Sequence, residues 1–277
     1  MSGIVLVTVP IGDEQDITLK AKSLIEQSVN IYAEDTRVFK ELCKRLAIDY
    51  SAKKIRSFHD HSGAGAIGLI LDLAQSETCL FVSDAGSPII SDPAYPLVLK
   101  AIEKDISVTN AAGISAVLSA LELSGLPPIP FHFHGFFGRD KGKITQELDQ
   151  IAQQYGTHIF FEGKSRVMST LELVGKRFPT SQICLCRELT KQFQSIHRFK
   201  GEEFSQIKES ITIKGEFVVL IGNSVKAAKS SSTQETLDLA QEIITSGAKP
   251  KKLAKLLALI TNTPSKDIYK KISGTRQ

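Results

Sequence analysis

Short apolar runs alternate with helical patterns along the first part of this 277-residue chain. The run Ile4 to Val9 is unbroken and rich in β-branched residues, which is typical of a buried strand. Helical spacing follows from Ile17 to Ser28, with Asp16 expected to cap that helix. The exchange recurs with a strand at Thr78 to Val82 and a helix at Pro93 to Lys104. Strands separated by helices pair in parallel, so the pattern predicts a parallel sheet with both faces covered.

A proline-rich segment interrupts this alternation. Gly125-Leu-Pro-Pro-Ile-Pro130 holds three prolines in four positions, which remove amide donors and cannot continue a helix. The alternation then restarts with strands expected at Phe131 to Phe136, Thr157 to Phe161, Ser181 to Cys186, Ser195 to Lys200 and Glu216 to Ile221. The sequence therefore predicts one α/β domain over residues 1–125 and a second over residues 131–222.

Charge is distributed unevenly along the chain. The formal net charge is +4, but Asn223 to Gln277 holds ten Lys or Arg and four Asp or Glu, a balance of +6. The remaining 222 residues hold 24 basic and 26 acidic groups, a balance of −2. After a linker at Ser224 to Thr233, residues 233–277 are expected to form a small basic extension of three helices. A basic end on a nearly neutral body favours a polyanionic partner, although it also serves solubility.

Composition excludes several classes of protein. With 42% hydrophobic and 23% charged residues, the chain is neither wholly disordered nor collagen-like nor a coiled coil. No apolar run reaches the ~18 residues of a membrane span. The four cysteines lie inside ordinary apolar segments, which argues against a disulfide framework. We expect a cytoplasmic protein that has no membrane partner.

Two motifs suggest sites that their surroundings do not support. Gly63-Ala-Gly-Ala-Ile-Gly68 matches a dinucleotide fingerprint, but the residues before it are too polar for the core strand that such a site requires. The pairs His59/His61 and His132/His134 lack an evident third metal ligand. We therefore expect neither a nicotinamide cofactor nor a metal.

Four loops follow predicted strands, where ligands of α/β sheets usually bind. They are Pro10 to Asp13, Glu34 to Arg37, Ser83 to Pro93 and Ala112 to Ser115. In these loops and beyond them, the chain resembles the ribosomal RNA ribose methyltransferase branch of the tetrapyrrole methylase superfamily. The motifs that carry the resemblance are Pro10-Ile-Gly12 with Asp16-Ile-Thr18, Ala33-Glu-Asp-Thr-Arg37, Ser83-Asp-Ala-Gly-Ser-Pro88 with Ser91-Asp-Pro93, Ser115-Ala-Val117 with Ser124-Gly-Leu-Pro127, Arg187-Glu-Leu-Thr-Lys191, Gly215-Glu-Phe-Val218, and the tail from Leu253 to Tyr269.

The resemblance implies two α/β domains with a pocket for S-adenosylmethionine between them, and a homodimer. It implies 2′-O-methylation of a decoding-centre cytidine in 16S rRNA, with that RNA or the small ribosomal subunit as partner. Carried over by position, the cofactor contacts are Pro10, Asp84, Gly86, Ser87, Ser115, Ala116, Phe161 and Leu189. The loop Gly163-Lys-Ser-Arg166 departs from the Ser-Pro-His-Arg that the family tends to have.

Charged residues in the motif loops are the candidates for chemistry and RNA binding. A ribose 2′-hydroxyl is a weak acid, so an acceptor within hydrogen-bond reach favours its attack. We expect Glu34, Asp35 or Glu188 to orient or deprotonate it. Phosphate contacts are expected from Arg37, Arg166, Arg187 and Lys191, and in the tail from Lys249, Lys251, Lys252 and Lys255.

Other interpretations stay open at this stage. The same charges can form structural ion pairs, such as Glu34 with Arg37 or Arg187 with Glu188. The whole chain can instead be a precorrin-type C-methyltransferase, which would not need the basic tail, or a noncatalytic RNA-binding module. A nicotinamide-dependent oxidoreductase would depend on Gly63 to Gly68 alone.

Overall fold

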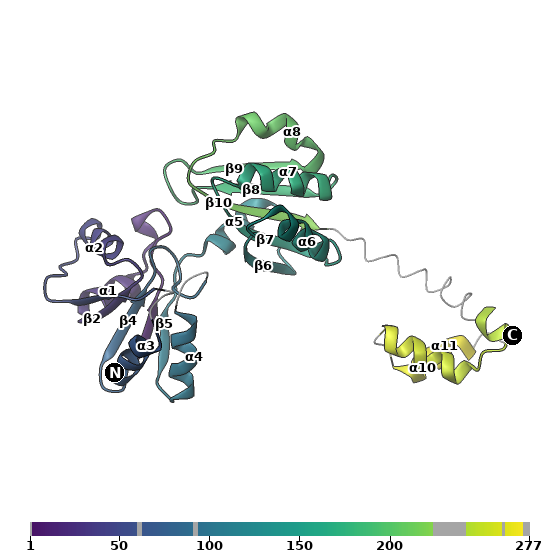
Figure 1. The fold of residues 1–277 in the computed structure, drawn as a ribbon, viewed down its shortest axis with the longest axis horizontal. Helices are drawn as coiled ribbons and strands as arrows, with labels where there is room; N and C mark the ends of the chain where they lie inside the picture. Colours follow the sequence, from purple (N-terminus) through teal and green to yellow (C-terminus); the bar gives the residue numbers. More distant parts are fainter. Residues whose placement is uncertain (1, 60–62, 91–93, 224–241, 262–263, 274–277) are drawn as a thin grey trace. The chain divides into compact units, whose positions relative to one another are not determined.

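The structure of this protein is a computed structural model that describes residues 2–59, 63–90, 94–223, 242–261 and 264–273 (Figure 1). The chain forms two compact units, Met1–Asn223 and Ser224–Gln277. Both five-stranded sheets lie in the first unit.

The first sheet has the strand order β3-β2-β4-β1-β5, and every neighbouring pair is parallel. Its strands are β1 (Gly3–Val7), β2 (Asn30–Ala33), β3 (Lys54–Ser57), β4 (Thr78–Val82) and β5 (Val108–Ala111). Helices α1 (Leu19–Gln27) and α2 (Thr36–Arg45) pack on one face, and α3 (Ala64–Ala74) and α4 (Tyr95–Glu103) pack on the other. Successive residues of β4 serve opposite faces, because Leu80 contacts the first pair of helices and Phe81 the second. The predicted parallel sheet with covered faces is confirmed.

In this half, one local prediction is wrong and one strand was not predicted. Asp16 does not cap α1: it lies in the short 3₁₀ helix η1 (Glu14–Asp16), and Thr18 Oγ1 accepts the bond from the Ala21 N–H at 3.2 Å instead. Strand β3 was not predicted, because it lies at the sheet edge and is mostly exposed, so its sequence Lys-Ile-Arg-Ser lacks an apolar run.

The second sheet has the order β6-β7-β10-β8-β9. Its strands are β6 (Phe131–Phe136), β7 (Gly156–Gly163), β8 (Gln182–Arg187), β9 (Ser195–Lys200) and β10 (Glu216–Asn223). Only β6 and β7 are parallel, and the other neighbours are antiparallel. One face is covered by α6 (Lys141–Ile151), α7 (Val167–Arg177) and the short α8 (Phe204–Ile207), which is flanked by η2 (Gly201–Glu203) and η3 (Lys208–Ser210).

Helix α5 (Ala116–Ser124) precedes the proline-rich segment but packs on the second sheet. Its buried residues Val117, Ala120 and Leu121 share a core with Ile159 of β7 and Leu220 of β10. The helix therefore connects the two sheets physically, although the predicted division assigns it to residues 1–125. That division stays a prediction.

In the second unit, α10 (Pro250–Thr261) and α11 (Ser265–Ser273) pack around Leu253, Ala254 and Ile272. Three helices are expected in residues 233–277, the first of them before α10, and of the stretch 233–245 the structure describes only residues 242–245, which are helical. The predicted linker lies outside the described residues. Within the described part of the chain, no helix has the length and apolarity to cross a membrane.

Candidate functional site

A cavity of about 380 Å³ lies where loops of the first sheet meet the second sheet. From the first half it is lined by Ile11, Glu34, Asp84, Ala85, Ile90 and Ala116. From the second half it is lined by Phe136, Phe161, Glu162, Gly163 and residues 215–218. Most of its surface is apolar, with carboxylates among the lining groups, which is the usual character of a small-molecule site. Of the predicted site residues, the cavity brings together Glu34, Asp84, Ala116 and Phe161.

The acidic side of the cavity is built from two neighbouring loops. Glu34 follows β2 and Asp84 follows β4, and these strands pair in the sheet. The Asp84 N–H donates to Glu34 Oε2 at 3.3 Å, and Asp84 Oδ1 accepts from the Asp35 N–H at 3.0 Å. Partial burial of its carboxyl raises the pKa of Asp84 although the residue is exposed, and the charge of Asp35 adds to the rise. Two carboxylates thus face the same cavity from adjacent strand ends.

Asp35 and Arg37 are engaged with each other. Asp35 is the N-cap of α2, accepting from the Arg37 N–H at 2.8 Å, and its carboxylate pairs with the Arg37 guanidinium at 2.6 Å. The hydrogen bonds from Arg37 lower the pKa of Asp35 to about 2, so its carboxylate is a weak proton acceptor. Neither residue lines the cavity. The predicted pairing of Glu34 with Arg37 is replaced by this Asp35–Arg37 pair.

The remaining predicted cofactor residues, Pro10, Gly86, Ser87, Ser115 and Leu189, do not line the cavity. Val9 and Gly86 form a two-way backbone bridge, at 3.0 and 3.1 Å, which brings buried Pro10 beside the loop of Asp84. Gly86 has a φ of +72°, a conformation that glycine adopts without strain. Ser87 is partly exposed and Ser115 stands at the N-cap of α5, while Leu189 is buried under that helix. Pro10, Gly86 and Ser115 are each next in sequence to a residue that lines the cavity.

Arg166 is committed to an internal network. Its guanidinium pairs with the buried Glu162 carboxylate at 2.6 Å and donates to the Gly138 carbonyl at 2.8 Å. The other Glu162 oxygen accepts from Thr170 Oγ1 at 2.7 Å. The arginine therefore balances a carboxylate whose side chain has no exposed surface.

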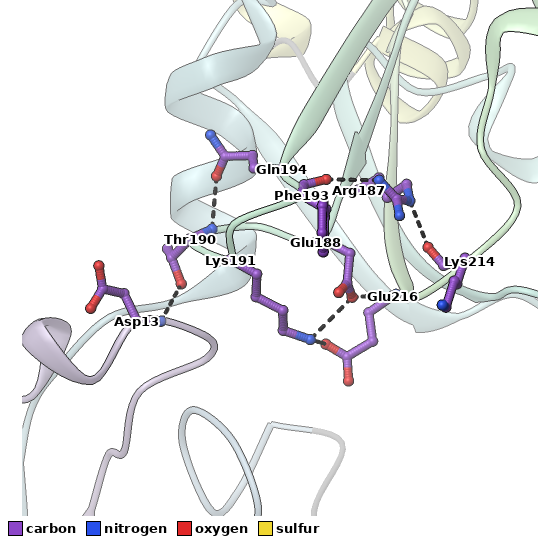
Figure 2. A network of polar contacts seen from close by, with 9 residues as sticks. All are labelled: Asp13, Arg187, Glu188, Thr190, Lys191, Phe193, Gln194, Lys214 and Glu216. Carbon is purple, nitrogen blue, oxygen red and sulfur yellow. Dashed lines mark hydrogen bonds and ion pairs between the residues drawn. The ribbon is translucent and has the colours of Figure 1, made fainter. Parts of the chain in front are cut away.

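Figure 2 shows a second network around the motif Arg187 to Lys191. Buried Arg187 donates to the carbonyls of Lys214 at 2.6 Å and Phe193 at 2.7 Å. Glu188 Oε1 accepts from Lys191 Nζ at 3.1 Å and from the Glu216 N–H at 3.0 Å. Lys191 also contacts Glu216 Oε2 at 2.8 Å. The predicted Arg187–Glu188 pair is thus replaced by Glu188–Lys191.

The hydrogen bonds and ion pairs of this network keep Glu188 and Lys191 charged. Burial would raise the pKa of Glu188, but the bonds from the Glu216 N–H and from Lys191 outweigh it, and the pKa of Glu188 is lowered. Burial would likewise lower the pKa of Lys191, but its two carboxylate partners raise it. Both groups are therefore charged at neutral pH.

The remaining predicted phosphate contacts are in the second unit. Lys249, Lys251, Lys252 and Lys255 are all exposed, at the start of α10 or just before it. Buried Leu253 and Ala254 lie between them in sequence, so the lysines occupy the outer surface of a helix with an apolar inner face.

Three histidines, His132, His134 and His158, lie close together in the second sheet. His134 Nε2 and His158 Nδ1 are 3.0 Å apart, and the His134 ring stacks on Phe160. Across the described ranges, no group of three or more His, Cys, Asp or Glu side chains has the arrangement of a metal site. All four cysteines are free and buried. Gly63 is the N-cap residue of α3.

Several lining residues were not identified from the sequence. Ile11, Ile90 and Phe136 look like ordinary apolar residues, and Glu162 directly follows the apolar run Ile159 to Phe161 in its strand. Residues 215–218 belong to one of the motifs that carry the family resemblance. Nothing in the local sequence indicates that β10 starts at the cavity. These residues line one cavity because of the order in which the strands are arranged in the sheets, which local sequence does not show.

Comparisons with known proteins match nearly the whole chain. A sequence model of the family described as Tetrapyrrole (Corrin/Porphyrin) Methylases matches residues 3–205. "Ribosomal RNA small subunit methyltransferase I" of Halalkalibacterium halodurans is 36% identical over 270 residues, which cover 95% of this chain and 92% of the relative. The protein of the same name from Bacillus subtilis is 31% identical over 275 residues, covering 97% and 93%.

Solved structures share the fold at low sequence identity. Diphthine synthase superposes with a TM-score of 0.61 at 12% identity, covering 79% of this chain and 89% of that one. The methyltransferase CobJ gives a TM-score of 0.59 at 17% identity, covering 81% and 95%. A uroporphyrin-III C-methyl transferase from Thermus thermophilus, solved with S-adenosyl homocysteine, gives 0.52 at 15% identity, covering 81% and 99%.

Proposed function

The chain belongs to the tetrapyrrole methylase family, whose methyl donor is S-adenosylmethionine, and from this premise we propose that it methylates RNA of the small ribosomal subunit. The proposed acceptor is the ribose 2′-hydroxyl of a decoding-centre cytidine in 16S rRNA. The observation that carries the proposal is the match to rRNA small subunit methyltransferases over 95% of the chain, at 36% identity. That match continues past residue 205, where the family model ends, and so takes in basic residues of the tail.

The cavity suits the proposed cofactor. Its volume of about 380 Å³ is in the range of small-molecule sites. Ile11, Ala116 and Phe161 offer apolar surface, while Asp84 offers negative charge for a sulfonium or an amino group. We therefore assign the cofactor to this cavity, with Pro10, Gly86, Ser87, Ser115 and Leu189 supporting its walls.

Glu34 is the proposed acceptor for the hydroxyl proton. S-adenosylmethionine supplies a methyl group on a positively charged sulfur. In the transfer, the ribose oxygen forms a bond to the methyl carbon as the carbon–sulfur bond breaks, and the hydroxyl proton must leave. Glu34 lines the cavity at a strand end, whereas the other two candidates, Asp35 and Glu188, do not line it. Positioning of the two reactants supplies much of the remaining rate.

RNA binding is assigned to the tail. Lys249, Lys251, Lys252 and Lys255 are exposed in the second unit, and exposed lysines bind phosphates without reading sequence. Arg37 is the exposed cation of the motif loops, its side chain 89% accessible. Three of the other predicted phosphate contacts have partners inside the protein: Arg166, Arg187 and Lys191. We therefore propose that these three residues stabilise the fold and do not bind RNA. The homodimer and the cytoplasmic location stay predictions.

The test is mass mapping of rRNA ribose methylation in cells with and without this protein, followed by addition of purified protein and S-adenosylmethionine to subunits from the deficient cells. The proposal expects one 2′-O-methyl group to be lost and then restored. If no ribose methyl group changes, the assignment of the acceptor is wrong. Methylation of a porphyrinoid by the purified protein would instead favour a C-methyltransferase.

A further inference from the structure

The loop that follows β8 has a backbone that its surroundings must hold in place. Glu188 and Thr190 have φ values of +51° and +62°, in a region that non-glycine residues rarely occupy. Such conformations persist where surrounding contacts stabilise them, and they are found preferentially at functional sites. The contacts of Glu188 and Thr190 lead to two different walls of the cavity.

Glu188 holds the first of these walls. Its N–H donates to the Glu216 carbonyl at 3.0 Å, and its carboxylate accepts from the Glu216 N–H at 3.0 Å. Lys191 contacts both carboxylates and completes the link. Because residues 215–218 line the cavity, Glu188 is bonded directly to a residue of that wall.

Thr190 contacts the loop that contributes Ile11 to the cavity lining. Its Oγ1 accepts from the Asp13 N–H at 3.1 Å, and its own N–H donates to Gln194 Oε1 at 2.7 Å (Figure 2). Gly12 packs so closely against Leu189, Thr190 and Lys191 that a Cβ would not fit. Ile11, which precedes Gly12, lines the cavity. The loop thus contacts the chain on both sides of the cavity.

We propose that Glu188 is a positioning residue that holds the two walls of the cofactor cavity at their working separation without touching the cofactor. This inference rests on the proposed function, because it takes the cavity as the cofactor site. The Glu188 side chain is 17% exposed and does not line the cavity, so a direct part in proton transfer is inconsistent with its place. Its ties to Glu216 and Lys191 explain instead why a carboxylate is needed there.

The experiment measures cofactor affinity and turnover separately. Glu188→Ala removes both links, and we expect the Kd for S-adenosylmethionine, measured by calorimetry without RNA, to rise about tenfold. Turnover at saturating cofactor should stay within about threefold of the unaltered protein, since uniform binding is lost rather than transition-state binding. Glu188→Gln keeps an acceptor for the Glu216 N–H and should show a smaller rise in Kd.

Two further variants keep the test decisive. Thr190→Val removes only the hydroxyl that accepts from Asp13, so it should raise the Kd about threefold even if Glu188→Ala does not fold. Glu172→Ala is the matched control, because it breaks an exposed carboxylate–lysine pair on α7 at 2.8 Å. That variant should leave the Kd unchanged.

Each outcome bears on one proposal. An unchanged Kd in both Glu188→Ala and Thr190→Val overturns the positioning role, as does a hundredfold loss of turnover with unchanged Kd, which would make Glu188 the base. If the unaltered protein binds S-adenosylmethionine but methylates no rRNA, the proposed substrate is wrong and the positioning role of Glu188 is unaffected.

Discussion

The Glu188 carboxyl group fills the space that a side chain on Gly215 would need. Gly215 has a φ of +95°, so its backbone too excludes other residues. The two residues come from separate motifs, 187–191 and 215–218, that lie far apart in sequence. Their contact brings the start of β10 to the cavity, which neither motif indicates alone.

Gly215→Ala should therefore destabilise the protein by at least about 1 kcal/mol, because the new methyl group meets the carboxylate and the backbone is strained. Urea denaturation measures the change. Gly68→Ala is the control: this glycine lies in α3 with open space around its would-be Cβ, and the change should stabilise by up to about 1 kcal/mol. Equal effects of the two substitutions would contradict the interpretation.

Glu34→Gln should lower turnover on small subunits by about a hundredfold or more, since a positioned proton acceptor contributes on that order. The Kd for S-adenosylmethionine should change by less than threefold, because the amide keeps the acceptor for the Asp84 N–H. Glu41→Gln, on the exposed surface of α2, is the control and should retain full turnover. Turnover of Glu34→Gln within threefold of the control would remove Glu34 as the acceptor.

Arg166→Met should lower the free energy of unfolding by about 3 kcal/mol, because it leaves the buried Glu162 carboxylate without its cation. Arg166→Lys keeps the charge and should cost less. Chemical denaturation gives both values, and filter binding gives the RNA affinity of the folded variants. Unchanged stability with weakened RNA binding would return Arg166 to the RNA-binding residues.

Acid should destabilise the second sheet through its histidines. Burial lowers the pKa of His134 to about 4, and burial also lowers the pKa of His158. An unfolded histidine titrates near ~6.5, so between about pH 6.5 and 4 the unfolded chain binds more protons than the folded one. Stability is therefore full above about pH 7 and falls as the pH drops toward 4. Denaturation midpoints across this range measure the loss, and His134→Phe should make the fall shallower. A fall of the same steepness in that variant would exclude His134 as a source.

Elements with a marked apolar period could be predicted from the sequence. Strands β4, β6 and β9 begin and end where the pattern placed them, and in β4 the apolar run follows directly from burial on the sheet. Strand β3 could not be predicted, since an edge strand needs no apolar run. Likewise, the packing of α5 on the second sheet depends on residues far away in sequence, which no local pattern indicates.

The same limit applies to the site. Glu34 and Asp84 could be selected because loops after parallel strands meet at one edge of the sheet. The partners of Arg166, Arg187 and Lys191 could not, since the motif shows which residues are charged and not which carbonyl or carboxylate faces them. Internal pairing of a cation is decided by tertiary contacts.

The tail offers the sharpest test of RNA binding. Lys251→Gln with Lys252→Gln removes two exposed positive charges from α10. If both contact phosphates of single-stranded RNA, the slope of log K against log salt should become shallower by about 1.4, or ~0.7 for each contact. Affinity for S-adenosylmethionine should not change. Lys100→Gln with Lys104→Gln, at the end of α4, removes the same charge and is the matched control. If both double variants weaken RNA binding equally, the effect is one of net charge and the tail has no particular role, whereas a loss confined to the tail variant identifies α10 as a phosphate contact.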